Sequence, residues 1–523
     1  MPFNSAIIRI FILAFGLFLA LYFGILVATD QLETLFWFSL AGGLLLCVWL
    51  GKNIWLLIPT TMYLNLSFPW LPGGFPPSQI AILVVLVWSL LLIMMRRLPL
   101  DLKMTHIEFA AIILLLSIFQ CYVRNPVGMA SMGSDQVGAK PYFNVGIALI
   151  GAIMLASIRV TPDRLRLTVK CMLGGSIFSF ATNFLAYLSP TVASVTGRYF
   201  GAWGSINAEA FGGAVDITAP VDSTAATRIE SAVEGGTLIS RWLASKYNPI
   251  RALMHPGWGI MLLLACGFAG MSGFRNVLIS VGFTLAFATY YWGKGRSLFA
   301  AMIVGGVAYL LLNLVNVVVP LPPNVQRSLT FLPGTWGDEY KLDAEHSTKW
   351  RTDMWKLALF TDRYIQNKFL GDGLGMTMKE FHFLQSLATM SYGLSEDLSQ
   401  ERAMITQAYH SGPVQTIRVT GYVGLLILLY AMGVVSVSAH RLIIRSRGTP
   451  WFGPIMFLTL HMVWHPIFFT LVFGAFKEDV PALLLNMGIL RLLQRNLPLD
   501  LRAPVTASAG EAVWQGKQRE AVA

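Results

Sequence analysis

Hydrophobic residues in this chain of 523 residues fall into long runs separated by short polar connections. A helix needs about 20 apolar residues to cross the hydrocarbon of a bilayer. Runs of this order, some of them shorter and expected to tilt or to lie deep, occur at 7–28, 35–50, 54–69, 80–95, 107–122, 143–158, 167–188, 257–273, 277–292, 298–319, 414–438, 452–474 and 481–493. The pattern predicts an all-α, polytopic integral membrane protein with about 12 transmembrane helices, in a range of about 11–13.

Composition favours the same class. Hydrophobic residues make up 55% of the chain and charged residues only 12%, with a mean hydropathy of +0.61, whereas soluble domains carry about 25% charged residues. The first run lacks a small-residue cleavage site and more spans follow at once, so it is interpreted as a retained helix. The cysteines lie within apolar runs without zinc spacing and are interpreted as small buried hydrophobic residues: Cys47, Cys121, Cys171 and Cys266.

The net charge of +11 could indicate a nucleic-acid partner. Its basic residues gather in short connections beside the spans, as the positive-inside rule produces, so the bilayer is the expected partner and no nucleic acid is expected. The basic connections placed in the cytoplasm contain Arg96, Arg97 and Lys103; Arg159, Arg164, Arg166 and Lys170; and His440, Arg441, Arg445 and Arg447.

This orientation places two long segments, 189–256 and 320–412, outside the cytoplasm. Three apolar runs separate these segments, although an even number is needed. Either one run is re-entrant or 298–319 contains two short helices. The predicted division is an N-terminal bundle (1–188), an extracytoplasmic loop (189–256), spans carrying Arg296 (257–319), a large helical periplasmic loop (320–412), C-terminal spans (413–500) and a cytoplasmic tail, interpreted as disordered (501–523).

The second long segment carries two short patterns. In "EHSTKWRTDMWKLALF" (345–360), apolar residues recur at helical spacing from Trp350, which predicts an amphipathic helix with Arg351 and Trp355 on a neighbouring face. In "NKFLGDGLGM" (367–376), glycines alternate, but no βαβ unit surrounds them, so a tight turn is favoured over a phosphate loop.

Four motifs in order, "GKGRSLFA" (293–300), "WRTDMW" (350–355), "FLGDGLG" (369–375) and "HSGPVQTIRVTGYVG" (410–424), resemble the O-antigen ligase and O-antigen polymerase superfamily of bacterial membrane glycosyltransferases. The resemblance covers roughly 257–440. Departures from the family pattern are the order Gly295-Arg296-Ser297, Ser411 in place of asparagine, Pro413 in place of an aromatic residue, and Val419 in place of an acidic residue.

The resemblance implies transfer of a glycan from an undecaprenyl-diphosphate carrier to a hydroxyl acceptor, such as a saccharide or lipid A core, at the periplasmic face of the bacterial inner membrane. It implies catalytic roles for His410, Arg351 and Arg296, and substrate binding by Arg418, Trp355, Gln415, Gly373 and Ser411. Because arginines rather than clustered carboxylates accompany the motifs, we expect the diphosphate to be stabilised by guanidinium groups, without a metal or other cofactor.

His410 stands where a helix is expected to begin, with Ser411 as a candidate N-cap and Pro413 suited to the first turn. The imidazole could act as a general base on the acceptor or as a hydrogen-bond donor to the diphosphate. Arg418, deeper in that helix, could bind phosphate or a backbone carbonyl.

Each residue also has a simpler interpretation. Arg296 alone would be an interfacial anchor, Arg351 and Trp355 an ordinary cation–π pair, and His410 a solvated loop histidine. His461 and His465 have metal-ligand spacing but lack a third ligand on the same run, so mutual or carbonyl hydrogen bonding is favoured.

A turn between the last two spans carries Lys477, Glu478 and Asp479. Glu478 or Asp479 could assist the acceptor, but a solvated turn is the favoured interpretation. A transporter or flippase of lipid-linked saccharides is the alternative function, disfavoured because no internal repeat is evident. Ligase, polymerase and protein glycosylation stay open.

Overall fold

The computed structural model describes residues 32–64, 66, 75–96, 103–127, 138–200, 228–376, 380–384, 386 and 396–497. The predicted span at 7–28 and the tail at 501–523 lie outside these residues. The elements are α2 (Leu32–Leu50), η1 (Gly51–Leu56), α3 (Leu57–Thr61), α4 (Pro77–Met94), α5 (His106–Arg124), α6 (Lys140–Ser157), α7 (Pro162–Leu188), α8 (Pro190–Phe200), α9 (Glu230–Lys246), α10 (Pro249–Ala252), α11 (Pro256–Met271), α12 (Arg275–Val318), α13 (Pro323–Leu329), α14 (Asp338–Phe360), α16 (Glu396–Ile405), α17 (Gly412–Ser446), α18 (Phe452–Leu471) and α19 (Phe476–Asn496).

The protein is all-α and multi-pass, as predicted. Within the described part of the chain, 8 helices are long and apolar enough to cross a membrane. They are Leu40–Thr61, Pro77–Met94, His106–Arg124, Lys140–Ser157, Pro162–Leu188, Arg275–Val318, Gly412–Ser446 and Phe452–Leu471. The predicted total of about 12 spans stays a prediction.

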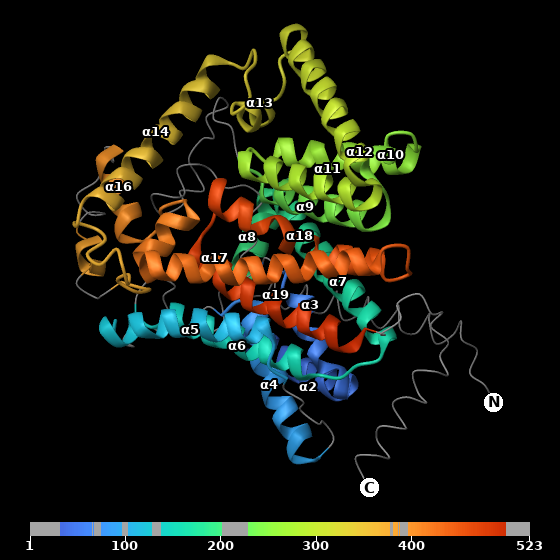
Figure 1. Ribbon diagram of the computed structural model, residues 1–523, viewed down its shortest axis with the longest axis vertical. Coiled ribbons are helices and arrows are strands. Elements are labelled where there is room, and N and C mark those ends of the chain that lie inside the picture. Colours follow the sequence, from blue (N-terminus) through green and yellow to red (C-terminus); the bar gives the residue numbers. More distant parts are fainter. Residues whose placement is uncertain are drawn as a thin grey trace, which may run out of the picture.

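The centre of the bundle is built on α17, which runs across the middle of Figure 1. It packs against α5 and α18, while α19 packs against α6. Side chains at these contacts are fully buried, among them Leu428, Ile455 and Leu484. Outward-facing side chains are also apolar, such as Leu426, as expected where lipid replaces water as the solvent.

Helix α12 contains two apolar segments joined by a sharp bend. Lys294 has φ 61° and ψ −163°, so the helix of 44 residues consists of two straight parts. The second part rises toward α13 at the top of Figure 1. The bend lies between the predicted runs 277–292 and 298–319, so these runs stay separate and 298–319 itself is continuous.

Segment 189–256, which is predicted to be an extracytoplasmic loop, contains the helix α9. It packs against α7, α11, α12 and α18. The Ile229 amide at its start donates to the Ser272 carbonyl (3.2 Å), and the Ala244 carbonyl near its end accepts from Trp292 Nε1 (2.9 Å). Helix α9 therefore lies alongside the first part of α12 over most of its length. The hydropathy pattern missed α9 because its sequence, "ESAVEGGTLISRWLASK", is polar.

Helices α13, α14 and α16 lie at one periphery of the bundle (Figure 1). The predicted amphipathic helix at 345–360 forms part of α14, where Met354 and Ala358 are fully buried. These side chains pack with Tyr409, Val414 and Ile417. Helix α14 is thereby attached to the segment that leads into α17.

Candidate functional site

His410 lies in a strained turn directly before α17. Its φ is 53° and that of Gln407 is 63°, a left-handed region that residues other than glycine adopt at an energetic cost. The centroid of the His410 ring lies 6.1 Å from that of Trp350 and 6.2 Å from that of Phe473. Such strain persists only where surrounding contacts hold the turn in place.

Trp355 and Gln415, both predicted to bind substrate, supply those contacts. Trp355 Nε1 donates to the Tyr409 carbonyl at 2.7 Å. Gln415 Nε2 donates to the Gln407 carbonyl at 2.6 Å, and Gln415 Oε1 accepts from the Phe476 amide. Both polar side chains are therefore engaged with backbone groups around His410.

Ser411 occupies the N-cap position of α17, but its side chain makes no capping hydrogen bond. The capping expectation for this hydroxyl was wrong. Its backbone carbonyl accepts instead from the Gln415 amide at 3.0 Å. Pro413 does lie in the first turn, as predicted.

Arginines from separate parts of the chain act electrostatically on one another: Arg228, Arg275, Arg327 and Arg351. We call these four residues the arginine cluster. Burial lowers the pKa of Arg351, and the charge of Arg327 lowers it further. Burial lowers the pKa of Arg228 to about 10, and the positive charges of the other three arginines add to that shift. The cluster is thus held together against mutual repulsion.

The turn between α11 and α12 brings three members of the cluster together. Arg327 Nη1 donates to the Gly273 carbonyl at 3.5 Å, and the Arg228 guanidinium lies 5.3 Å from the centre of the Phe274 ring. Arg275 follows directly in sequence. Asp343, which accepts from Arg327 Nε at 2.9 Å, is the carboxylate whose charge acts on the cluster. Asp343 therefore compensates part of the positive charge of the cluster.

The cluster also acts on His410. Burial lowers the pKa of His410 to about 4, and the charges of Arg351 and Arg228 contribute in the same direction. The imidazole is therefore neutral at physiological pH in the free protein. A bound anion would offset the arginine charges and raise this pKa.

Arg296 is not part of this arrangement. It is exposed, just beyond the bend at Lys294 in α12. Nearby on α12, the Tyr291 hydroxyl lies 2.6 Å from His440 Nδ1, and the Tyr291 carbonyl accepts from Arg447 Nε at 2.8 Å. His440 and Arg447 mark the end of α17 opposite to His410. Residues 422–440 of α17, beyond its break at Gly421, alone span about 28 Å, so the structure separates Arg296 from His410.

Gly421 is where α17 breaks, with φ 71° and ψ −175°. The glycine-rich turn 367–376 fills this break. Amides of Tyr422 and Val423 donate to the carbonyls of Lys368 and Phe369, at 2.8 and 3.3 Å. In the opposite direction, the turn donates to the helix carbonyls that the break leaves without an intrahelical partner. The Asp372 amide donates to the Arg418 carbonyl and the Gly373 amide donates to the Val419 carbonyl, each at 2.9 Å.

The glycines of this turn serve close packing. A Cβ on Gly371 would lie 2.3 Å from the Val419 carbonyl oxygen, and one on Gly373 would lie 2.7 Å from Tyr142 Oη. Both glycines also have positive φ, 78° and 95°. The predicted tight turn is therefore confirmed. The Gly373 amide is used within the protein, at the junction with α17, rather than facing a ligand.

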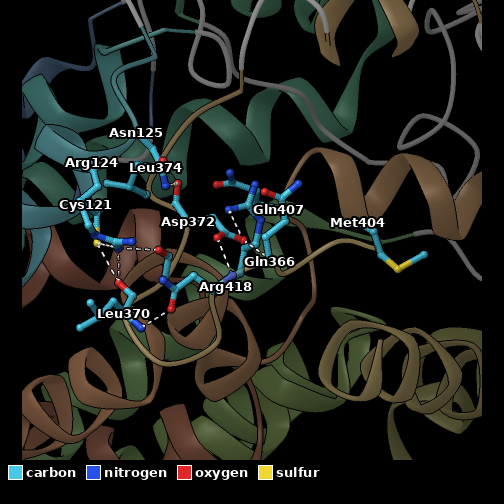
Figure 2. A network of polar contacts seen from close by, with 12 residues as sticks. Cys121, Arg124, Asn125, Gln366, Leu370, Asp372, Leu374, Met404, Gln407 and Arg418 are labelled. Atoms are coloured by element: carbon cyan, nitrogen blue, oxygen red, sulfur yellow. Dashed lines mark hydrogen bonds and ion pairs between the residues drawn. The ribbon is translucent and has the colours of Figure 1, made fainter. Parts of the chain in front are cut away.

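Figure 2 shows how α5 holds the same turn. Arg124 Nη2 donates to the carbonyls of Leu370 and Gly371, at 2.9 and 2.7 Å, and Asn125 Nδ2 donates to the Asp372 carbonyl at 3.1 Å. Arg418 lies at the centre of this network, with its Nη1 3.4 Å from Asp372 Oδ2. The carboxylate of Asp372 therefore compensates the charge of Arg418.

The sequence analysis identified one of the four clustered arginines. Arg228, Arg275 and Arg327 precede or follow apolar segments in three unrelated stretches, "TRIE", "GFRN" and "VQRS". Each is a single arginine beside an apolar stretch, a position that interfacial anchors share.

No family model matches this chain, and no curated protein matches it. Among solved structures, it is similar to a chain from "Structural coordination of polymerization and crosslinking by a peptidoglycan synthase complex". That similarity has a TM-score of 0.40 and 15% sequence identity, and covers 75% of this chain and 98% of the other. At this TM-score it carries no argument about function.

Proposed function

We propose that this protein is a membrane glycosyltransferase that transfers a glycan from an undecaprenyl-diphosphate donor to a hydroxyl acceptor, in the manner of an O-antigen ligase or polysaccharide polymerase. The observation that carries the proposal is a cluster of four mutually interacting arginines, of which Arg351 and Arg228 act on His410, with Asp343 as a counter-charge. Guanidinium groups bind phosphate oxygens through paired, charge-assisted hydrogen bonds.

The arginine cluster fits the electrostatic demand of this reaction. As the glycosidic bond breaks, negative charge grows on the departing lipid diphosphate. Fixed cations in a water-poor site stabilise such charge more in the transition state than in the ground state. In the described residues, His, Cys, Asp and Glu form no group of three that could hold a metal ion. Metal independence is part of the proposal, and transfer in the presence of EDTA tests it.

His410 is the proposed base that accepts the proton of the attacking hydroxyl. Its imidazole is neutral in the free protein and has a lone pair available, because burial and the arginines oppose its protonation. The diphosphate charge would raise the pKa of His410 toward the range in which proton transfer is efficient. The same imidazole can instead donate a hydrogen bond to the diphosphate, and the pH dependence of transfer distinguishes these roles.

A transporter or flippase of lipid-linked saccharides is the second candidate. The interruptions of α12 at Lys294 and of α17 at Gly421 favour it, because discontinuous helices are common in transporters. Purified protein with an undecaprenyl-diphosphate glycan and a hydroxyl acceptor separates the two functions. Glycan transfer in detergent supports the enzyme. Movement of the lipid across vesicles without transfer would contradict the enzyme proposal.

A further inference from the structure

A cavity of about 400 Å³ lies inside the bundle, between α9 and the start of α4. Its volume is within the range of small-molecule sites. Its walls include Tyr63, Pro76, Ser78, Ser176, Glu234 and Arg241. Ser176 lies in the middle of α7, a helix long and apolar enough to cross a membrane, so the cavity is at membrane depth.

Arg241 on α9 brings a positive charge to this cavity. Its guanidinium lies 4.2 Å from the centre of the Tyr63 ring and 6.0 Å from that of Phe457. The described residues give this guanidinium neither a hydrogen bond nor an ion pair. Its nitrogens are not among the fully buried atoms that lack a partner, so the guanidinium is open to the cavity that it lines. A stacked guanidinium keeps its N–H donors available at its edge.

Two other arginines of the bundle show how such a charge is usually satisfied. Arg447 Nε donates to the Tyr291 carbonyl at 2.8 Å, and Arg491 Nη2 donates to the Lys103 carbonyl at 3.0 Å. A charged group at membrane depth is costly unless other groups compensate it. Arg241 differs from these two residues and is suited to compensation by an anionic ligand.

Glu234 is the carboxylate in the cavity wall, and it is bonded to another helix. Its Oε1 accepts from Ser179 Oγ on α7 at 2.7 Å. Glu234 and Arg241 are seven positions apart on α9, about 10 Å along a helix, and no ion pair joins them. The charge of Arg241 is therefore available to a ligand.

The start of α4 offers further donors to the same cavity. Pro76 at its N-cap provides no capping side chain, and the first turn contains no acidic residue. The amides of Gln79 and Ile80 donate to the Pro76 carbonyl, at 3.0 and 3.2 Å. The Ser78 amide and hydroxyl have no partner among the described residues. Free amides at a helix N-terminus favour an anion beside them.

We propose that this cavity binds an oxyanion, a phosphate or carboxylate group, between Arg241 and the start of α4. Guanidinium and free amide groups both donate to such a group. Arg228 of the arginine cluster precedes Arg241 by 13 positions, about 20 Å along a helix. The site is therefore separate from the arginine cluster and does not depend on the proposed function. Its ligand is a phospholipid headgroup or a soluble acidic molecule.

Thermal unfolding of the full chain in a nonionic detergent tests the site, with inorganic phosphate and glucuronate as soluble probes. A ligand that binds the folded protein raises its melting temperature. Arg241→Gln should weaken the binding of the probe roughly 10- to 100-fold, the range for a lost charge-assisted hydrogen bond. Arg241→Lys should weaken it less, because lysine keeps the charge but loses the paired donors.

Arg251→Gln is the matched control for the loss of one positive charge. Arg251 is exposed on α10 and does not line the cavity, so this variant should bind the probe like the wild type. Ser78→Ala should weaken binding up to roughly tenfold. Since the Ser78 hydroxyl has no partner among the described residues, this variant should melt at the wild-type temperature without ligand.

Native mass spectrometry distinguishes the two sources of the oxyanion. Protein released from nanodiscs of phosphatidylglycerol should retain one phospholipid more in the wild type than in Arg241→Gln if the ligand is a lipid headgroup. Stabilisation by a soluble probe without this difference identifies a soluble acidic ligand. Either result supports the site.

Arg351→Ala separates this site from the arginine cluster. Anion binding that persists in Arg351→Ala and is weakened in Arg241→Gln supports the cavity site, whether or not the protein transfers a glycan. Binding lost in Arg351→Ala but unchanged in Arg241→Gln would overturn it. The absence of both probe stabilisation and a difference in retained lipid would overturn it as well.

Discussion

Arg418 and Asp372 form an ion pair at 3.4 Å that joins the break in α17 to the glycine-rich turn. Both side chains are largely buried, with 12% and 13% of their surface exposed. The pair lies within a network of backbone bonds between 367–376 and α17. The sequence leaves open whether Arg418 binds phosphate or a backbone carbonyl, and in the structure its guanidinium pairs with Asp372.

Arg418→Ala should therefore destabilise the protein rather than abolish donor binding selectively. Removing one partner of a buried pair leaves the other charge uncompensated, at a cost of about 3 kcal/mol or more. Asp372→Ala should cost a similar amount. Thermal unfolding in detergent, combined with donor binding below the melting temperature, checks this. Wild-type stability together with lost donor binding would place Arg418 on the diphosphate.

Gly421→Ala should disrupt the same junction through sterics. Gly421 has φ +71°, and a Cβ there would lie 2.1 Å from the Phe369 carbonyl oxygen. We expect a lower melting temperature and loss of transfer, because the turn 367–376 can no longer approach the helix.

Gly433→Ala is the control on the same helix. A Cβ at Gly433 meets nothing within 4 Å, and alanine favours a helix by about 1 kcal/mol over glycine. This variant should be as stable as the wild type or more stable. Equal behaviour of both alanine variants would contradict a requirement for glycine at 421.

Arg351→Ala should abolish transfer without loss of expression or membrane insertion. Removing one donor that stabilises transition-state charge costs about 10²–10³ in rate in well-studied enzymes. Arg351→Lys should recover part of the rate, because a lysine keeps the charge but loses paired hydrogen bonding. Initial transfer rates of purified variants at equal concentration are the measurement.

Arg296→Ala provides the comparison for that experiment. Arg296 is exposed and lies toward the opposite end of α17 from His410. We expect this variant to retain transfer. Loss of transfer with normal folding would restore the catalytic role that the sequence motif suggested for Arg296.

The pH dependence of transfer should report the neutral state of His410. If His410 is the base, kcat/KM falls only as the free imidazole becomes protonated, at a pKa of about 4. We expect kcat/KM to stay level from neutral pH to about one unit above that value. The acidic limb of the kcat profile should lie at higher pH than that of kcat/KM, because the bound diphosphate raises the pKa of His410.

His410→Ala should abolish transfer and, if residual activity is measurable, remove the acidic limb from both profiles. A profile of kcat/KM that rises as the pH falls would contradict the base and favour a protonated imidazole that donates to the diphosphate. Expression and melting temperature, unchanged from the wild type, would exclude misfolding as the cause.

The sequence determined the class of protein and the local elements that carry it. Long apolar runs predict membrane helices because hydrocarbon leaves backbone groups no partner outside the helix. The spacing in 345–360 predicted α14, and the glycines of 367–376 predicted a turn, because these are local properties of the chain. His410 was placed at the start of α17 for the same reason.

Tertiary structure alone decided which charged residues meet. Arg228, Arg275, Arg327 and Arg351 are distant in sequence, and their gathering depends on how α9, α11, α13 and α14 pack. The polar helix α9 escaped the hydropathy pattern because protein neighbours, rather than lipid, surround much of it. The fold also places Arg296 toward the opposite end of α17 from His410, and it pairs Arg418 with Asp372. Which charges share one solvent-poor space depends on distances across the fold, and these distances are not local properties of the sequence.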